Sequence, residues 1–309
     1  MNKHNLVLSF ITILILTVTG CSLQTGQVVG TSAPQSQIPQ PGSICRGSDL
    51  SPLGVLRSTD HGRTWTSLGN ACIKDLHILP ADPTPSFGNG RIMLFVVDLS
   101  NLNKPTPQSI YSTTSVDGLN FDAPRPVYTQ PNTMVDPFIL RLADGSFRMY
   151  VPSDPEGTIS AVSRDGLTFS REAGLRLTGG GSGMPGALLL PDGQVRLFLS
   201  GDGIWSMISN DGLNFTKENG FRIPGPANSI VDNPEPIRLA DGSYLMLYQV
   251  HDKKLENLLP WERDEIHLAT STDGYDWNPN PAILGYGGTS CVVEVSDGTL
   301  YIYYGTKPR

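Results

Sequence analysis

The sequence predicts an all-β fold: a five-bladed β-propeller of four-stranded antiparallel blades, in which the N- and C-terminal strands share the closing blade. The first observation is a turn motif, S-x-D-G-x-x-(F/W), which occurs four times and, with one extra residue before the glycine, a fifth time at residues 58–65; the copies are spaced by roughly 50 residues. A second series of Asp-Gly or Asn-Gly hairpins alternates with it. The composition agrees, because 33 Gly and 25 Pro in 309 residues indicate many turns. The aspartates of the five motif copies are Asp60, Asp117, Asp165, Asp211 and Asp273.

The first 44 residues are expected to lie outside the propeller. Lys3 is followed by an apolar run from Leu6 to Val18, which is shorter than the ~20 residues of a membrane-spanning helix. The next residues, ending at Cys21, resemble a bacterial lipobox. That resemblance implies a signal peptide over residues 1–20 and a lipid on the Cys21 thiol; an ordinary secretory signal is the alternative. Either way we expect an exported protein.

Residues 21–44 are rich in Gln, Ser, Thr, Gly and Pro, which indicates a flexible tether before a propeller over residues 45–309. Cys45, Cys72 and Cys291 would remain after lipidation of Cys21. In an oxidising compartment they predict one disulfide and one free thiol, and Cys45 with Cys72 is favoured because Cys45 lies in a pliable segment.

The bulk properties limit the partners. A net charge of −7 argues against a nucleic-acid partner. We expect a monomer that contacts the membrane only through its lipid. No metal-ligand spacing such as C-x-x-C occurs, and we expect no required cofactor. The sequence leaves open whether a structural cation binds at the channel.

Each repeat is expected to form strand A, an Asp-Gly turn, strand B, a variable loop, strand C, the S-x-D-G turn and strand D. Four blades are expected over residues 72–128, 134–177, 183–223 and 230–284. Residues 291–295 and 300–304 would then supply strands A and B of the last blade, and residues 55–58 and 64–68 its strands C and D. This arrangement closes the ring and removes its exposed edge. Both series of turns fall on one face, so ligand-binding residues are expected on the opposite face, around the central channel.

The candidate catalytic residues come from the starts of the innermost strands. Aligning the blades superposes Asp75, Asp136, Met184, Asn233 and Thr289, and two residues further on His77, Phe138, Gly186, Glu235 and Cys291. Glycoside hydrolysis uses two carboxylates, and the candidates are Asp75, Asp136, Asp232 and Glu235. The alternative is that these acids only bond backbone amides at the strand starts.

The candidate substrate-binding residues lie on the same face. Carboxylates there could bind hydroxyl groups, and tryptophans could stack on sugar rings; the long loop from His251 to Arg263 is of a length that often carries function. For Asp154-Pro155 and Asp202-Gly203, plain turn formation is the competing interpretation. The candidates are His77, Asp154, Asp202, Trp205, His251 and Trp261.

Two resemblances extend these expectations. The S-x-D-G turns resemble the Asp-boxes (BNR-like repeats) of sialidases and other sugar-handling propellers. The segment from Met134 to Tyr150 resembles an opening blade of the arabinanase, levansucrase and invertase-like glycosidases, which are five-bladed. That likeness implies that Asp136 is the base or nucleophile.

The same likeness implies an acid two blades later, where Asp232-Asn233-Pro234 stands with Asp in place of Glu and with Glu235 nearby. A third carboxylate is expected in the blade between, yet Gly183-Met184-Pro185 has none. If the family's site residues are instead matched starting one blade earlier, Asp75 and Asp136 fit the family's pattern, but Met184 then stands at the position of the acid.

A sialidase activity is the less favoured interpretation. Phe221-Arg222-Ile223-Pro224 resembles the sialidase F-R-I-P element. However, Arg222 aligns with Arg176 of the preceding blade, which places it in an outer strand far from the channel.

The sequence therefore predicts a cell-surface, lipid-anchored, glycoside hydrolase-like propeller that acts on a poly- or oligosaccharide. A non-catalytic propeller that binds glycan or protein is the main alternative, and a scaffold subunit of an envelope complex is a third. A third carboxylate close to Asp136 would favour the enzyme. A channel mouth plugged by Met184, Phe138 and the long loop would favour the binding protein.

Overall fold

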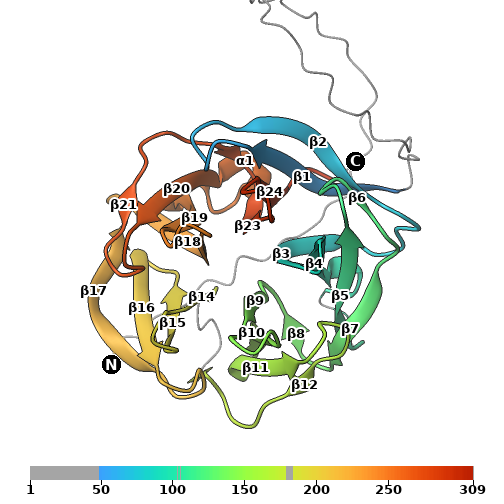
Figure 1. The fold of residues 1–309 in the computed structure, drawn as a ribbon, viewed down its shortest axis with the longest axis horizontal. Helices are drawn as coiled ribbons and strands as arrows, with labels where there is room; N and C mark the ends of the chain where they lie inside the picture. The colour runs from blue at the N-terminus through green and yellow to red at the C-terminus, as the bar shows by residue number, and fades with distance from the viewer. Residues whose placement is uncertain (1–48, 103, 105, 179–183, 309) are drawn as a thin grey trace, which may run out of the picture. The chain divides into compact units, whose positions relative to one another are not determined.

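The computed structural model describes residues 49–102, 104, 106–178 and 184–308. The predicted signal peptide, the tether, Cys21 and Cys45 lie outside these residues. The described part folds into five antiparallel sheets set around one axis, as Figure 1 shows, so the prediction of a five-bladed propeller is confirmed. None of its helices is long and apolar enough to cross a membrane.

Four blades follow one another along the chain, each running from an inner to an outer strand. The first contains β3 (Pro80–Gly88), β4 (Arg91–Asp98), β5 (Gln108–Ser115) and β7 (Arg125–Gln130). The second contains β8 (Thr133–Met134), β9 (Phe138–Arg141), β10 (Phe147–Asp154), β11 (Gly157–Ser163), β12 (Ser170–Arg171) and β13 (Leu177–Thr178). The third contains β14 (Gly186–Leu189), β15 (Val195–Leu199), β16 (Gly203–Ser209) and β17 (Thr216–Pro224). The fourth contains β18 (Ser229–Arg238), β19 (Tyr244–Asp252), β20 (Glu265–Ser271), β21 (Asn278–Pro279) and β22 (Gly285–Tyr286), and the short helix α1 (Pro260–Arg263) lies in its β19–β20 loop.

The fifth blade joins the two ends of the propeller, as predicted. Its order is β23 (Gly288–Glu294), β24 (Leu300–Gly305), β1 (Leu50–Ser58) and β2 (Thr66–Ile73). The β24–β1 pairing runs from Leu53 opposite Gly305 to Ser58 opposite Leu300. A further short strand of the first blade, β6 (Asn120–Phe121), pairs in parallel with the end of β2, so the closing blade is also hydrogen-bonded to its neighbour.

This pairing corrects the expected start of the first blade. Cys72 belongs to β2 of the closing blade, and the first blade begins only at Pro80. Cys72 is disulfide-bonded, while its predicted partner Cys45 lies outside the described residues. Cys291 is a buried free thiol in β23.

The S-x-D-G turns, called here the Ser-x-Asp turns, share one hydrogen-bond pattern. In the turn of the third blade, the Gly212 amide donates to Ser209 Oγ (2.9 Å), and the Ser209 hydroxyl and the Leu213 amide donate to Asp211 Oδ1 (both 2.8 Å). Gly212 has a φ of 69°, a left-handed conformation that favours glycine. These hydrogen bonds give the aspartates of the turns a structural role.

The aromatic residue of the turn packs against the preceding blade. The Phe169 ring lies 5.9 Å from that of Phe95 in β4, and the Trp277 ring lies 5.7 Å from that of Phe198 in β15. These contacts bury apolar surface between blades. The turns therefore join neighbouring blades together.

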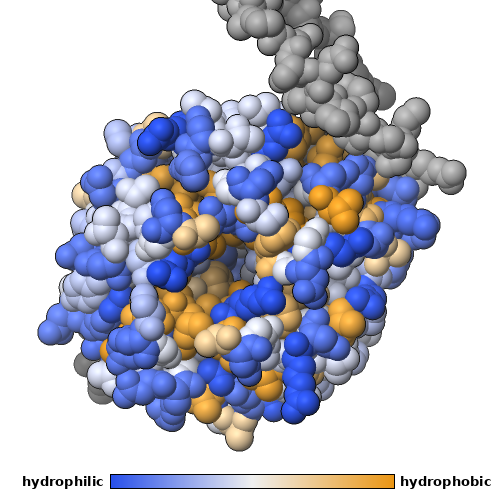
Figure 2. All heavy atoms as spheres, in the orientation of Figure 1, coloured by the Kyte–Doolittle hydropathy of each residue, from blue (hydrophilic) through white to orange (hydrophobic). Residues whose placement is uncertain are grey.

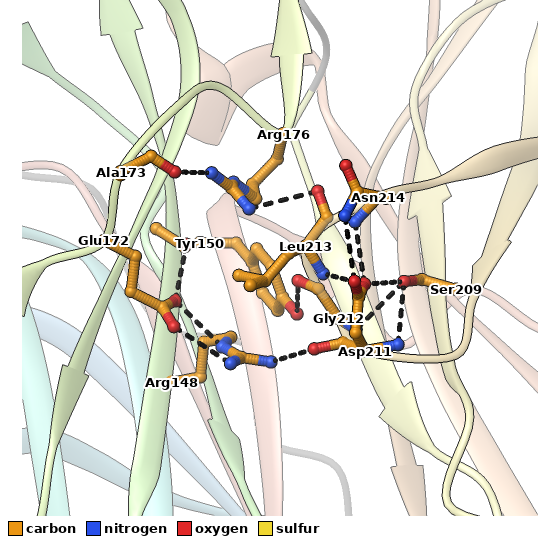
Figure 3. A network of polar contacts seen from close by, with 11 residues as sticks. Arg148, Tyr150, Glu172, Ala173, Arg176, Ser209, Asp211, Gly212, Leu213 and Asn214 are labelled. Carbon is orange, nitrogen blue, oxygen red and sulfur yellow. Dashed lines mark hydrogen bonds and ion pairs between the residues drawn. The ribbon is translucent and has the colours of Figure 1, made fainter.

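Polar contacts reinforce the same joint, and Figure 3 shows the one between the second and third blades. Arg148 of β10 forms a bidentate ion pair with Glu172 and donates to the Asp211 carbonyl of the next blade's turn (2.9 Å). The Tyr150 hydroxyl donates to the neighbouring Gly212 carbonyl (2.8 Å). We call this group the Arg148 clamp.

The centre of the propeller is partly open. Figure 2 shows a hollow in the middle of one face, with hydrophobic side chains on part of its wall. A cavity of about 370 Å³ runs along the inner strands, from Arg238 near the turns to Glu235 further in, and Phe138 and Val293 line it. Of the candidate catalytic residues, Glu235 lines this cavity.

Candidate functional site

The inner strands bend at equivalent points in three blades. Asp82, Asp136 and Asn233 have left-handed φ angles of 47°, 46° and 49°, and each is followed by a proline. The strand is broken between β8 and β9 at Asp136, and the pairing register shifts at Asp82 and Asn233. Such backbone is uncommon for non-glycine residues and gathers at functional sites. The bends release these side chains from the regular sheet near the channel.

Asp82 stands where the sequence alignment had placed Asp75. Asp75 and His77 are exposed residues of the connection between β2 and β3, so their expected place at the start of an inner strand is wrong. The alignment failed because β2 extends to Ile73 and residues 74–79 only link two blades. The dipeptide Asp82-Pro83 matches Asp136-Pro137, and this signal could have identified Asp82.

Asp82 and Asp136 are joined by Thr289 of β23. The Asp136 amide donates to Asp82 Oδ2 (3.1 Å). Thr289 Oγ1 lies 3.1 Å from Asp82 Oδ1 and 3.0 Å from Asp136 Oδ1. Burial raises the pKa of both carboxyls, and the nearby charge of Asp82 raises that of Asp136 further. Three blades therefore meet at one pair of carboxyl groups.

Glu235 of β18 is the third carboxyl of this group. It is 8% exposed and lines the channel cavity. Burial and the charges of Asp136 and Asp82 raise its pKa well above the usual value of 4.5. Gly186 of β14 allows its strand to approach, because a Cβ on Gly186 would lie 1.9 Å from the Pro234 carbonyl oxygen.

Asp232 belongs to a second buried cluster, in the fourth blade. His251 Nδ1 lies 3.0 Å from Asp264 Oδ1 and 3.8 Å from Asp232 Oδ2, and Arg263 Nε lies 2.9 Å from Asp264 Oδ1. Burial and the charge of Asp264 raise the pKa of Asp232 to about 7. Asp264, which the sequence analysis missed, thus connects the long β19–β20 loop to the wall of the channel.

The other candidates do not converge on the carboxyls. The exposed Asp202 pairs with Lys253 of the long loop (2.7 Å). Trp205 in β16 lies under the Lys217 ammonium, and Asp154 ends β10. Trp261 in α1 has a buried ring nitrogen without a hydrogen-bond partner among the described residues. Of this set, only His251 lies in a cluster that includes one of the candidate acids.

Arg222 occupies the outer position that the sequence analysis assigned to it. Its guanidinium lies 3.6 Å from the ring centre of Tyr275 in the next blade's Ser-x-Asp turn. The corresponding Arg176 donates to the Leu213 carbonyl of the turn that follows it (Figure 3). Both arginines therefore join blades.

The described residues contain no group of three or more His, Cys, Asp or Glu side chains arranged to hold a metal ion.

The comparisons with known proteins identify the fold. No protein-family model matches the chain, and no curated protein sequence matches it. Solved structures do. A GH32 β-fructofuranosidase from Bombyx mori has a TM-score of 0.56 at 12% identity, over 74% of this chain and 55% of that one.

Two further structures are matched over most of their own length. An endo-arabinase from Bacteroides thetaiotaomicron has a TM-score of 0.54 at 16% identity, over 76% of this chain and 92% of that one. An α-L-arabinofuranosidase from Clostridium thermocellum has a TM-score of 0.52 at 16% identity, over 72% and 81%. This chain spans only about half of the Bombyx mori enzyme. At these identities the likeness shows the fold alone.

Proposed function

We propose that the protein is a glycoside hydrolase acting on a poly- or oligosaccharide at the channel mouth. The observation that carries this proposal is the contact between Asp82 and Asp136. Glu235 belongs to the same group, because the charges of both aspartates raise its pKa. A third carboxyl close to Asp136 was expected to favour an enzyme, and Asp82 is such a group. The names of the structural neighbours support a glycan substrate.

The environments of the carboxyls suggest their roles. Asp82 accepts two hydrogen bonds, which favour its ionised form and oppose the effect of burial on its pKa. It is therefore the base or nucleophile, in place of Asp136. Glu235, whose raised pKa keeps it protonated, gives its proton to the glycosidic oxygen as that bond breaks. Asp82 either takes a proton from the attacking water or attacks the anomeric carbon itself.

Substitutions of these carboxyls test the proposal. The soluble domain is first screened against nitrophenyl glycosides and plant polysaccharides. On a substrate found this way, Asp82→Asn and Glu235→Gln should each lower kcat at least about 100-fold, because each removes a group that transfers a proton or electron pair. Asp75→Asn is the matched control and should keep full activity, since Asp75 is exposed and away from the channel.

The alternative acid is Asp232, whose pKa of about 7 also suits proton donation. If Glu235→Gln stays active and Asp232→Asn does not, the acid is Asp232. Full activity in Asp82→Asn would place the base elsewhere.

A non-catalytic glycan-binding propeller is the second candidate, and the depth of the carboxyls favours it. Asp136 and Glu235 are only 9% and 8% exposed, so a sugar must enter a narrow space to reach them. A glycan that binds without being hydrolysed, and whose affinity falls in Asp82→Asn, would support this candidate.

We further propose that the chain is exported and lipid-anchored to a bacterial cell envelope through Cys21. The lipobox-like residues that end at Cys21 support this localisation. A Cys21→Ser variant should carry no lipid and should leave the membrane fraction, as measured by metabolic lipid labelling and fractionation. A Cys21→Ser variant that is still labelled and still pellets with membranes would contradict the proposal.

A further inference from the structure

Thr289 Oγ1 lies within hydrogen-bonding distance of two carboxyl oxygens, but its hydroxyl group has only one hydrogen to donate. Its Oγ1 lies 3.1 Å from Asp82 Oδ1 and 3.0 Å from Asp136 Oδ1. A carboxylate oxygen only accepts hydrogen bonds, whereas a protonated carboxyl can also donate one. If both aspartates were ionised, one of these contacts would bring two lone pairs together.

The surroundings of the pair hold no compensating positive charge. Among the described residues, no basic side chain forms an ion pair with Asp82, Asp136 or Glu235. The ionisable groups that interact with Asp136 include Asp82 from β3 and Asp232 and Glu235 from β18, and all three are acidic. Two close carboxyls in such a setting share a proton, because like charges disfavour the second ionisation.

The hydrogen bonds also indicate which aspartate carries the proton. Asp82 accepts the Asp136 amide at Oδ2 and faces Thr289 at Oδ1, so both its oxygens are positioned as acceptors. Among the described residues, the Asp136 carboxyl has one hydrogen-bond partner, the Thr289 hydroxyl. The ionised form of Asp82 is therefore better stabilised than that of Asp136.

We infer that Thr289 is a proton bridge: a protonated Asp136 donates to Thr289 Oγ1, and the Thr289 hydroxyl donates to an ionised Asp82. Thr289 is then a positioning residue, which fixes one proton on Asp136 and leaves Asp82 as the anion. This protonation state stands on the geometry of the three side chains and does not depend on the proposed hydrolysis.

The direct test is a carbon-13 NMR titration of the aspartate side-chain carboxyls in the unsubstituted protein. Asp136→Asn and Asp82→Asn assign the two resonances, and Asp232→Asn removes the separate carboxyl of the His251 cluster. At pH 7 the Asp136 carbon should show the shift of a protonated carboxyl, and the Asp82 carbon that of a carboxylate. Two ionised shifts at pH 7 would overturn the inference, and so would a proton on Asp82 instead of Asp136.

Substitution of Thr289 tests the bridge itself. Thr289→Val keeps the shape but removes the hydroxyl, so Asp136 should release its proton at a pH lower by up to about one unit, the equivalent of one hydrogen bond. Thr289→Ser should restore the original midpoint. An unchanged midpoint in Thr289→Val would show that Thr289 only fills space. The titration needs no substrate, so a failure to find one would contradict the hydrolase proposal and leave this result intact.

Discussion

At the scale of single residues, the channel mouth holds acidic groups that folding has removed from water. Asp136 and Glu235 are both buried, and their surroundings raise the pKa of each. Burying a carboxylate without a partner is costly, so such a group stays protonated or destabilises the fold. Asp136 and Glu235 therefore lower the unfolding free energy of the protein near neutral pH.

Glu235→Gln should reveal that cost. In the unfolded chain the carboxyl ionises near its usual pKa of 4.5, while the folded protein holds the proton to a higher pH. The stability that this group contributes is thus full below about pH 4.5 and falls as the pH rises towards the folded pKa. Glu235→Gln should match the unsubstituted protein at pH 4 and exceed its unfolding free energy at pH 8, with a difference that grows by up to about 1.4 kcal/mol per pH unit.

Urea unfolding at a series of pH values measures this difference. Glu256→Gln, in the exposed part of the β19–β20 loop, is the control and should give a difference that does not depend on pH. A constant offset for Glu235→Gln would mean that Glu235 ionises in the folded protein as it does in water.

The site was only partly predictable from the sequence, for a physical reason. The alignment of the blades placed Asp136, Glu235 and Thr289 near the starts of inner strands. This was possible because the alternation of apolar residues and the spacing of turns indicate where a strand begins. Asp82 was missed because the link before the first blade has no turn signal that separates it from β3. The left-handed bends and register shifts at Asp82 and Asn233 depend on packing between blades, which periodicity does not report.

At the scale of secondary-structure elements, the outer turns join neighbouring blades in addition to the contacts between their inner strands. The Arg148 clamp connects β10 to the Ser-x-Asp turn of the third blade. An equivalent clamp connects β15 to the fourth blade, where Arg196 pairs with Glu218 and donates to the Gly274 carbonyl. The turn motif was recognisable in the sequence, but its use as an acceptor for the preceding blade was not.

Arg148→Met should therefore weaken the contact between two blades. It leaves the mostly buried Glu172 without its bidentate partner, and we expect a loss of about 2 kcal/mol in unfolding free energy. The exposed Arg91–Asp122 pair is the control, and Arg91→Met should cost less than about 1 kcal/mol. Adding Glu172→Gln to Arg148→Met should recover part of the loss. Equal effects of Arg148→Met and Arg91→Met in denaturant unfolding would show that the clamp adds no stability of its own.

At the scale of the whole molecule, the ring depends on strands that are far apart in the chain. β1 and β2 contribute Leu53, Val55, Ala71 and Ile73 to the core, and none of the four is exposed. The five-bladed architecture and the shared blade followed from the sequence, since the leftover half-blades at the two ends complete each other. The parallel β2–β6 pair was not foreseen, because two-residue strands leave no periodic signal.

Deletion of residues 46–71 should open the ring. The deletion removes β1 and most of β2, and it leaves the edge of β24 and the apolar face of the fifth blade uncovered. Calorimetry and light scattering should show a lost or broadened unfolding transition and self-association. A shortened chain that melts as cooperatively as the full domain would show that the closing blade is dispensable.

The position of β24 in the sheet also determines when the ring can close during protein synthesis. β24 lies between β23 and β1 in the sheet, yet among the described strands β1 comes first along the chain and β24 last. Until residues 300–305 have been made, the edge of β1 that pairs with β24 has no partner strand and is free to pair wrongly with another chain. The ring can close only after Leu300–Gly305 has been made, so a chaperone that shields residues 50–73 until then would raise the yield of folded protein.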